Sequence, residues 1–407
     1  MELLSDVFLY VVEAGLQSED TRFATGTFAF LQVCKRWNEV AVGSPQLWVW
    51  WIPGTLKAWD LFRSRSKDAP LFLTWRHCPP GPVPNTLTDT VTGRRIRQLD
   101  FNGTHQQLEQ ILGTLDSRST STTSSIRLRY PSYEKNDNGE HLARLFSLSF
   151  PKLSKLDINT FPPDPTSPIL TTSNLTSLKL DLAYNDDRRY TQSQFLQALQ
   201  QHPNLEQLHL RTGGFPSVEN SGGLVPVVLS HLVDLRLYGT DEVIDGFIDL
   251  VSMSSPLHNV TIDFECNNAP SVAAHENTAK RILTVYYGCK ELEYPRKATH
   301  LTVSSPPPCH LTIGARSHSS SAHRPIYNLE LRFHGMRGAL AQKVVHLFPL
   351  KHVRKYTIER FDPPADDWRR TLRRMKGLLH LRLDSMDIVP ALNALNLINE
   401  GVHREVT

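Results

Sequence analysis

Four side chains with the chemistry of metal ligands lie close together in this sequence. They are Cys309, His310, His318 and His323, within the tract SSPPPCHLTIGARSHSSSAHRPI. Thiolate and imidazole are ligands that Zn²⁺ prefers, so a metal site is one interpretation. The tract is also rich in Ser and Pro, a composition typical of loops. We favour a loop that holds no metal, and we expect the protein to use no cofactor.

A dense cationic group lies further along the chain, and such a group could bind an anion. Two acidic residues come first and five basic residues follow: Asp366, Asp367, Arg369, Arg370, Arg373, Arg374 and Lys376. Acidic side chains at the start of a helix and basic ones at its end interact favourably with the helix dipole. The order therefore favours a solvent-exposed helix over an anion site.

The signatures of common enzymes are missing. The sequence contains no GxxxxGK[ST], GxGxxG, HExxH or GxSxG, which mark phosphate, dinucleotide, zinc-protease and hydrolase sites. The net charge is only +3 over 407 residues, which gives no global signature of nucleic-acid binding. No apolar run reaches the ~18 residues that a membrane span needs. We predict a protein that is not an enzyme and binds neither nucleic acid nor a membrane.

The strongest pattern is a repeat of the form LxxLxL, in which other aliphatic residues can replace leucine. The clearest copies are Leu175, Leu178 and Leu180; Leu205, Leu208 and Leu210; and Leu232, Leu235 and Leu237. Weaker copies before and after these give a mean period of about 28 residues, inside the range of leucine-rich repeats. The last two apolar residues of each triad are two apart, as in a strand with one buried face.

Helix-like stretches such as TQSQFLQALQQHPNL separate the triads. Each repeat is therefore expected to be a helix, a turn and a short strand, and stacked repeats bury a shared core. Right-handed crossovers predict parallel strands on a concave face and helices on a convex face. Ala183, Gly213 and Thr240 stand where leucine-rich repeats usually have Asn or Cys, so we predict an irregular solenoid over residues 53–407. The alternative is an ordinary α/β domain.

The predicted strands also suggest a binding surface. Polar residues alternate with the buried leucines and face the opposite side of the sheet. They are Lys179, His209, Arg236 and Thr261, which we predict to contact a target protein. Residues 151–270 carry a net charge of −7, and the acidic residues expected on nearby loops predict a basic target: Asp181, Asp186, Asp187, Asp241, Glu242 and Asp245.

Residues 1–52 follow a different pattern and are predicted to form a small helical bundle. Leu3, Leu4, Val7 and Phe8 share one helix face, and a second apolar run follows from Phe28 to Ala41. Pro45 suits the first turn of a short third helix that carries Leu47 and Trp48. A bundle of about 50 residues is marginal alone and would gain from docking on a partner.

Three segments of this module resemble the F-box motif. They are ELLSDVF at 2–8, FLQVCKRWNEVA at 30–41 and SPQLW at 44–48, and the following PGTLKAWDLFRSRSKDAPL is similar to F-box proteins of mushroom-forming fungi. The resemblance implies docking on the small adaptor of an SCF-type cullin–RING ubiquitin ligase, and through it on a cullin. The adaptor-binding residues that it implies are Leu3, Leu4, Val7, Phe8, Leu31, Val33, Leu47 and Trp48.

The resulting prediction is a substrate receptor in the ubiquitin-conjugation pathway, whose repeats bind an unknown target protein. The family's opening Leu-Pro is missing before Glu2, so a repeat scaffold that acts without the ubiquitin ligase is the alternative. An enzyme on an α/β scaffold is a third hypothesis without sequence support. Five scattered cysteines with no CxxC pair, and no signal-peptide pattern, predict a cytoplasmic or nuclear protein.

Overall fold

The computed structural model divides the chain into two compact units, Met1–Leu180 and Asp181–Thr407. The predicted boundary at residue 52 lies inside the first unit. The structure describes residues 2–17, 28–51, 56–75, 83, 90–113, 115, 120–129, 140–159, 163–172, 174–181, 192–212, 226–252, 257–264, 272–287, 300–304, 310–317, 327–334, 339–348, 350–359, 364–384 and 405–406.

The first unit begins with helices and continues as alternating helices and strands. Its elements are α1 (Glu2–Gln17), η1 (Ala29–Gln32), α3 (Lys35–Gly43), η2 (Pro45–Trp48), β1 (Trp50–Trp51), α4 (Leu56–Ser66), β2 (Leu71–Trp75), α5 (Thr90–Gly93), β3 (Ile96–Asn102), α6 (His105–Leu112), β4 (Ser125–Arg129), α8 (Glu140–Phe146), β5 (Lys155–Asn159), α9 (Pro168–Thr171) and β6 (Ser177–Asp181). The strands are hydrogen-bonded in sequence order, and the pairs from β1 to β5 are parallel.

An aromatic cluster holds the first helices together. The ring of Phe8 on α1 stacks on Phe30 at 4.3 Å, and the edge of Trp37 meets it at 5.2 Å. Trp48 is 1% exposed and donates its indole N–H to the carbonyl of Ala41 over 2.8 Å. The buried indole therefore has its polar atom satisfied, as a core tryptophan requires.

The start of α6 shows how local sequence sets an element. Thr104 and Gln107 form a capping box, in which each side chain binds the backbone N–H of the other residue. Gln107 Oε1 also lies 3.3 Å from the indole nitrogen of Trp75 on β2, which ties the helix to the sheet. A Cβ on Gly103 would lie 2.7 Å from Gln107 Oε1 and 2.8 Å from Phe101 Cζ. Only glycine fits between the strand and the helix without a shift of these neighbours.

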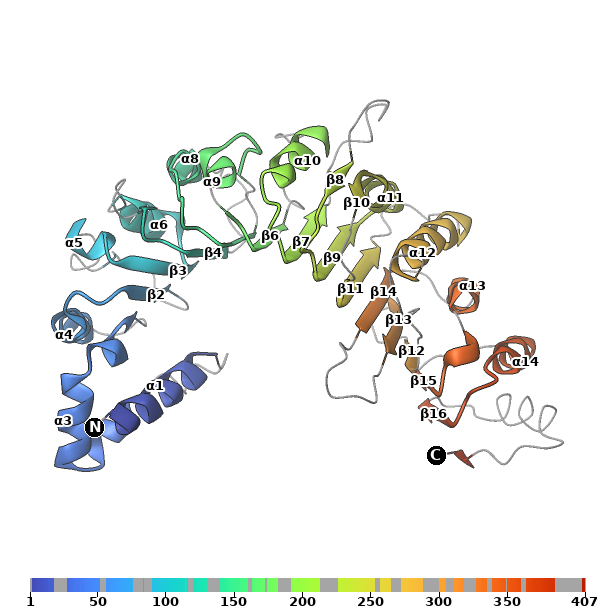
Figure 1. Cartoon of the computed structure of the whole chain (residues 1–407), viewed down its shortest axis with the longest axis horizontal. Helices are drawn as coiled ribbons and strands as arrows, with labels where there is room; N and C mark the ends of the chain where they lie inside the picture. Colours follow the sequence, from blue (N-terminus) through green and yellow to red (C-terminus); the bar gives the residue numbers. More distant parts are fainter. Residues whose placement is uncertain are drawn as a thin grey trace. The chain divides into compact units, whose positions relative to one another are not determined.

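The second unit repeats the pattern of helix and strand. Its elements are α10 (Gln192–Gln200), β7 (Gln207–Thr212), β8 (Val227–Val228), β9 (Asp234–Gly239), α11 (Asp241–Leu250), β10 (Val251–Ser252), β11 (Asn259–Phe264), α12 (Val272–Tyr287), β12 (His300–Ser304), β13 (His310–Ser317), β14 (Tyr327–His334), α13 (Ala339–Leu347), η3 (Leu350–His352), β15 (Lys355–Glu359), α14 (Ala365–Arg374), β16 (His380–Asp384) and β17 (Glu405–Val406). Within each unit the helices that alternate with the strands lie on one side of them (Figure 1).

The sheet of the second unit departs from the prediction that all strands are parallel. Its strand order is β7-β9-β11-β14-β13-β12-β15-β16-β17, and β13 runs antiparallel to both β12 and β14. After β11 the chain forms α12 and then a three-stranded antiparallel meander, β12–β13–β14. Because β14 and not β12 pairs with β11, the meander enters the sheet in reverse order.

A hydrogen-bond ladder links the repeats where their strands begin. The amides of Val233 and Asp234 both donate to the carbonyl of Glu206, over 2.8 and 3.0 Å. His258 and Asn259 donate in the same way to the carbonyl of Val233. Matching pairs join 154 and 155 to 124, 176 and 177 to 154, and 379 and 380 to 354. The same two backbone bonds therefore recur at five strand starts.

The chain is thus an α/β protein with mostly parallel strands. The predicted buried strand positions are confirmed, since Leu178, Leu208, Leu235 and Leu329 are all at most 1% exposed. Packing against the helices removes these side chains from water, and each fully buried leucine contributes about 1.5–3 kcal/mol.

Candidate protein-binding surface

The polar side of the sheet in the second unit carries a continuous pattern of side chains across four strands. Cα pairing places His209 opposite Arg236, Arg236 opposite Thr261, and Thr261 opposite Glu330. Three of the four predicted target-binding residues therefore form one cross-strand row. The fourth, Lys179, lies on β6 in the first unit and is half-buried.

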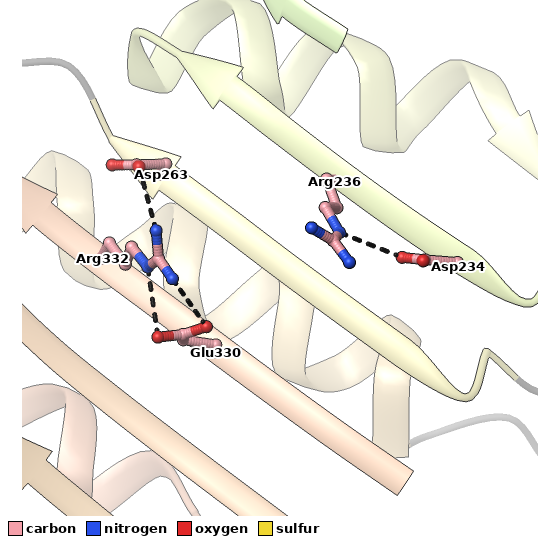
Figure 2. Close-up of polar contacts among 5 residues, drawn as sticks. All are labelled: Asp234, Arg236, Asp263, Glu330 and Arg332. Atoms are coloured by element: carbon pink, nitrogen blue, oxygen red, sulfur yellow. Dashed lines mark hydrogen bonds and ion pairs between the residues drawn. The ribbon is translucent and has the colours of Figure 1, made fainter. Parts of the chain in front are cut away.

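A recessed carboxylate supports the centre of this row. Asp234 Oδ1 lies 3.4 Å from Arg236 Nε (Figure 2). Its other oxygen, Oδ2, lies 3.4 Å from His209 Nε2. Burial raises the pKa of Asp234, but contacts with His209 and Arg236 outweigh it, and the pKa falls below its usual value. Asp234 therefore stays ionised and positions both side chains.

A second charged group lies on the neighbouring strands. Arg332 on β14 contacts both carboxylate oxygens of Glu330, each over 3.1 Å, and its Nη1 lies 4.0 Å from Asp263 Oδ2 (Figure 2). The hydrogen bonds that Arg332 donates to Glu330 raise the pKa of Arg332, and partial burial acts in the opposite direction. Because this fork is already bidentate, Arg332 is less available to a partner than Arg236.

The arginines stand above the carboxylates that hold them. The Arg236 side chain is 55% exposed and the Asp234 side chain 11%. Arg211 and Asp181 are 43% and 15% exposed, with 3.5 Å between Arg211 Nη1 and Asp181 Oδ2. The Arg211 guanidinium also lies 4.5 Å from the centre of the Tyr238 ring. This acidic part of the sequence therefore presents arginines to solvent.

The first unit contains the same arrangement. Arg127 on β4 lies between two aspartates in register on β3 and β5, with 3.3 Å from its Nη1 to Asp100 Oδ2 and 2.9 Å from its Nε to Asp157 Oδ2. The arginine side chain is 35% exposed and Asp100 only 4%. The sequence analysis did not predict this ion-paired arginine. Asp100, Arg127 and Asp157 occupy matching positions in three successive copies of the leucine pattern, and this alternation of charge could have indicated it.

Two of the acidic residues behind the expectation of a basic target are already paired within the second unit, whereas Glu242 on α11 is exposed. Asp181 is recessed beside Arg211, and Asp245 accepts a hydrogen bond from Thr278 over 2.9 Å and pairs with Arg281. Asp245 is therefore occupied on the helix side of the unit. Asp186 and Asp187 lie outside the described residues.

The predicted adaptor-binding residues fall into three groups. Leu3 is 79%, Val33 59% and Val7 48% exposed, and Leu4 and Leu31 are half-buried. Phe8, Leu47 and Trp48 are at most 1% exposed and form the core of the first helices. These three side chains therefore shape the surface and offer a partner no contact area of their own.

Two exposed residues of α1 were missing from the predicted set. Tyr10 is 73% and Val11 44% exposed, on the same helix as Leu3 and Val7. Their helical spacing from Val7, at i+3 and i+4, was a signal for one shared face.

Of the four side chains that were considered as metal ligands, only His310 lies in the part of the chain that is described. Cys309, His318 and His323 lie outside it, and His310 begins β13. Within the described ranges, no group of three or more His, Cys, Asp or Glu residues could hold a metal ion. The predicted loop is corrected in part, because HLTIGARS forms strand β13, with Ile313 and Ala315 buried.

The cationic group forms helix α14, as its charge order predicted. Asp366 and Asp367 lie in the first turn, and Arg373 and Arg374 in the last.

None of the helices in the described ranges is long and apolar enough to cross a membrane. A scan of protein-family models and a search of curated proteins found no match for this chain.

Proposed function

We propose that the protein is the substrate-recognition subunit of an SCF-type cullin–RING ubiquitin ligase. The observation that carries the proposal is the exposure of apolar side chains on the N-terminal helices: Leu3 and Val7 one turn apart on α1, and Val33 between η1 and α3, are each about half or more exposed. Exposed apolar side chains grouped on a small helical module usually mark an interface. The same helices carry the residues of the F-box-like segments.

The adaptor contact is refined by burial. Tyr10 and Val11 would extend the adaptor surface on α1. The other residues that would touch the adaptor are Leu3, Leu4, Val7, Leu31 and Val33. Phe8 and Trp48 would instead hold the helices in the geometry that presents it, because both lie in the core. Their contribution to binding would be structural.

The strands and helices after this module would form an irregular leucine-rich-repeat solenoid. The repeated pair of backbone bonds at the strand starts supports this architecture, since equivalent units stack through equivalent contacts. A target would bind on the polar sheet face around Arg236, whose exposed guanidinium is held by Asp234. The protein would perform no chemistry and would raise the effective concentration of a target lysine near the ubiquitin-carrying enzyme, in the cytoplasm or nucleus.

Adaptor binding is the test of this proposal. The full chain and a variant with Leu3→Asp and Val7→Asp are passed over the immobilised SCF adaptor. Both positions are exposed, and acidic residues suit the first turns of a helix, so the variant should fold. We expect the parent chain to be retained and the variant to be lost.

A matched control carries the same change of charge and polarity elsewhere. Val91→Asp with Leu379→Asp alters two side chains that are 61% and 58% exposed but lie outside the N-terminal helices. This control should bind like the parent. A parent chain that fails to bind any SCF adaptor while remaining folded would favour the scaffold function without the ubiquitin ligase.

A further inference from the structure

The first unit contains a groove along the edge where its strands begin. The groove has a volume of about 710 Å³ and is lined by residues just before or at the start of β2 to β6. Neighbouring parallel strands lie about 4.8 Å apart, so five strands give a groove about 19 Å long. An extended peptide covers about 3.3 Å per residue, so the groove matches a segment of about six residues.

The charge of this groove is strongly positive. Arg94, Arg95, Arg97 and Lys152 line it, against one acidic residue, Asp68. Arg97 and Lys152 are exposed, and neither has an ion-pair partner among the residues described. Arg236 and Arg127 on the sheet face are paired with aspartates. Arg97 and Lys152 have no such carboxylate among the described residues to balance their charge.

Arg95 has a structural role at one edge of the groove. The Arg95 side chain donates to the carbonyl of Ala69 from Nε and Nη2, over 3.0 and 2.9 Å, and to Ser66 Oγ over 2.7 Å. These bonds fix the turn between α4 and β2, where Lys67 adopts a φ of 49°. The edge of the groove is therefore preorganised, which reduces the entropy lost when a ligand binds.

Hydroxyl groups follow the length of the groove between the cations. Thr176 Oγ1 donates to the carbonyl of Ser154 over 3.2 Å, Ser154 Oγ to that of Ser124 over 3.1 Å, and Ser124 Oγ to that of Arg97 over 3.3 Å. Each hydroxyl oxygen keeps lone pairs that can accept a backbone N–H of a bound peptide. None of the described residues that line the groove is aromatic, so among them there is no stacking platform of the kind that single-stranded nucleic acids use.

We propose that this groove binds an extended, acidic polypeptide segment of about six residues. Carboxylates of the segment would pair with Arg97 and Lys152, and its backbone would lie along the hydroxyls of Ser124 and Ser154. The site is separate from the adaptor surface and from the polar sheet face of the second unit. It does not depend on a role in ubiquitin ligation.

Fluorescence anisotropy with labelled hexaglutamate and the full chain tests the proposal. We expect hexaglutamate to bind at least about tenfold more tightly than hexaglutamine or hexalysine, with affinity that falls as salt rises. The double variant Arg97→Glu, Lys152→Glu should weaken binding by about tenfold or more, because it replaces two attractive contacts with repulsive ones. A variant with Arg97→Gln and Lys152→Gln repeats the measurement if the glutamates lower the thermal unfolding midpoint.

The matched control is Arg36→Glu with Arg144→Glu, which makes the same change in net charge at two exposed positions outside the groove. It should bind hexaglutamate like the parent. Equal loss in this control, or no binding by the folded parent, would overturn the proposal. Competition gives a further outcome that would overturn the proposal. In that outcome a single-stranded oligonucleotide, or inorganic phosphate at equal ionic strength, displaces hexaglutamate from the parent but not from the groove variant.

Discussion

Asp234 and Arg236 are two residues apart on β9, with 3.4 Å between Asp234 Oδ1 and Arg236 Nε, yet only 11% of the aspartate side chain is exposed against 55% of the arginine. The aspartate thus acts as a buried support for a guanidinium at the surface. An arginine held in this way loses less side-chain entropy when it binds a partner than a free one would. The relationship gives Asp234 a role in stability and Arg236 a role in recognition.

Asp234→Asn should reduce the free energy of unfolding by about 1–3 kcal/mol, because hydrogen bonds to a charged group are lost at a largely buried position. Urea denaturation at neutral pH measures this change. The matched control is Asp384→Asn, at an exposed carboxylate at the end of β16, which should change stability by less than about 0.5 kcal/mol. Equal effects of the two variants would contradict the supporting role of Asp234.

The same variant should alter the acid sensitivity of the protein. The pKa of Asp234 is lower in the folded state than in the unfolded chain, so its contribution is complete above about 3.9 and is lost as pH falls through the folded value. The free energy of unfolding should therefore decrease less on acidification in Asp234→Asn than in the parent. A steeper decrease in the variant would show that the sign is wrong.

His346 on α13 should make stability depend on pH near neutrality. Its Nε2 lies 3.0 Å from Thr371 Oγ1, and burial lowers its pKa, with Arg374 and Arg370 acting in the same direction and Asp367 opposing them. The unfolded state then binds the proton more tightly, so stability decreases as pH falls below about 6.5.

Urea denaturation of the parent and of His346→Gln at pH 7.5 and 5.5 checks this prediction. We expect the difference between the two pH values to shrink in the variant. The control is His380→Gln, at an exposed histidine of β16, which should keep the parent's pH dependence. A parent whose stability rises on acidification over this range would contradict the prediction.

Leu208→Ala should cost about 2–5 kcal/mol, since the side chain is fully buried under the helices of the second unit. In a repeat array the damage should stay near the mutated repeat, so hydrogen exchange should increase first in β7, β9 and β11. Leu379→Ala, at a 58% exposed leucine, is the control and should change little. Equal loss of protection in α1 would argue against stacked, locally stabilised repeats.

Two glycine substitutions should have opposite signs. Gly103→Ala forces a Cβ to within 2.8 Å or less of Gln107 and Phe101, so we expect a loss of about 1–3 kcal/mol. A Cβ on Gly43, at the end of α3, meets no atom within 4 Å, and Gly43→Ala should stabilise by about 0.4–1 kcal/mol. Thermal unfolding of both variants decides whether the close packing between β3 and α6 is correctly described.

The sequence was sufficient to locate most strands, because burial on one face imposes an alternation that is visible in residues such as Leu208 and Leu210. It could not predict strand direction, since alternation is the same in parallel and antiparallel strands. The HLTIGARS segment shows the difficulty. Its alternation was outweighed by the Ser and Pro residues on both sides, although Ile313 and Ala315 are buried in β13.

The sites were harder to predict than the fold. Phe8 and Trp48 carried the pattern of an interface, but a small helical cluster uses the same apolar residues for its core. The relative heights of Asp234 and Arg236 depend on side-chain conformation, which spacing does not encode. The groove in the first unit was missed because its cations stand at turns or, as Arg97 does, at the start of a strand, and the leucine pattern does not mark these positions.

The paired amide bonds at the strand starts also determine how the second unit should respond to mechanical force. The bonds to the carbonyls of Glu206, Val233 and Arg354 run from strand to strand across the sheet. A pull in this direction loads the junctions in series. Every junction then carries the same force, and the weakest one breaks first. Single-molecule extension should show small, successive lengthening steps of about one repeat each, in contrast to the single large rupture of a sheet sheared along its strands.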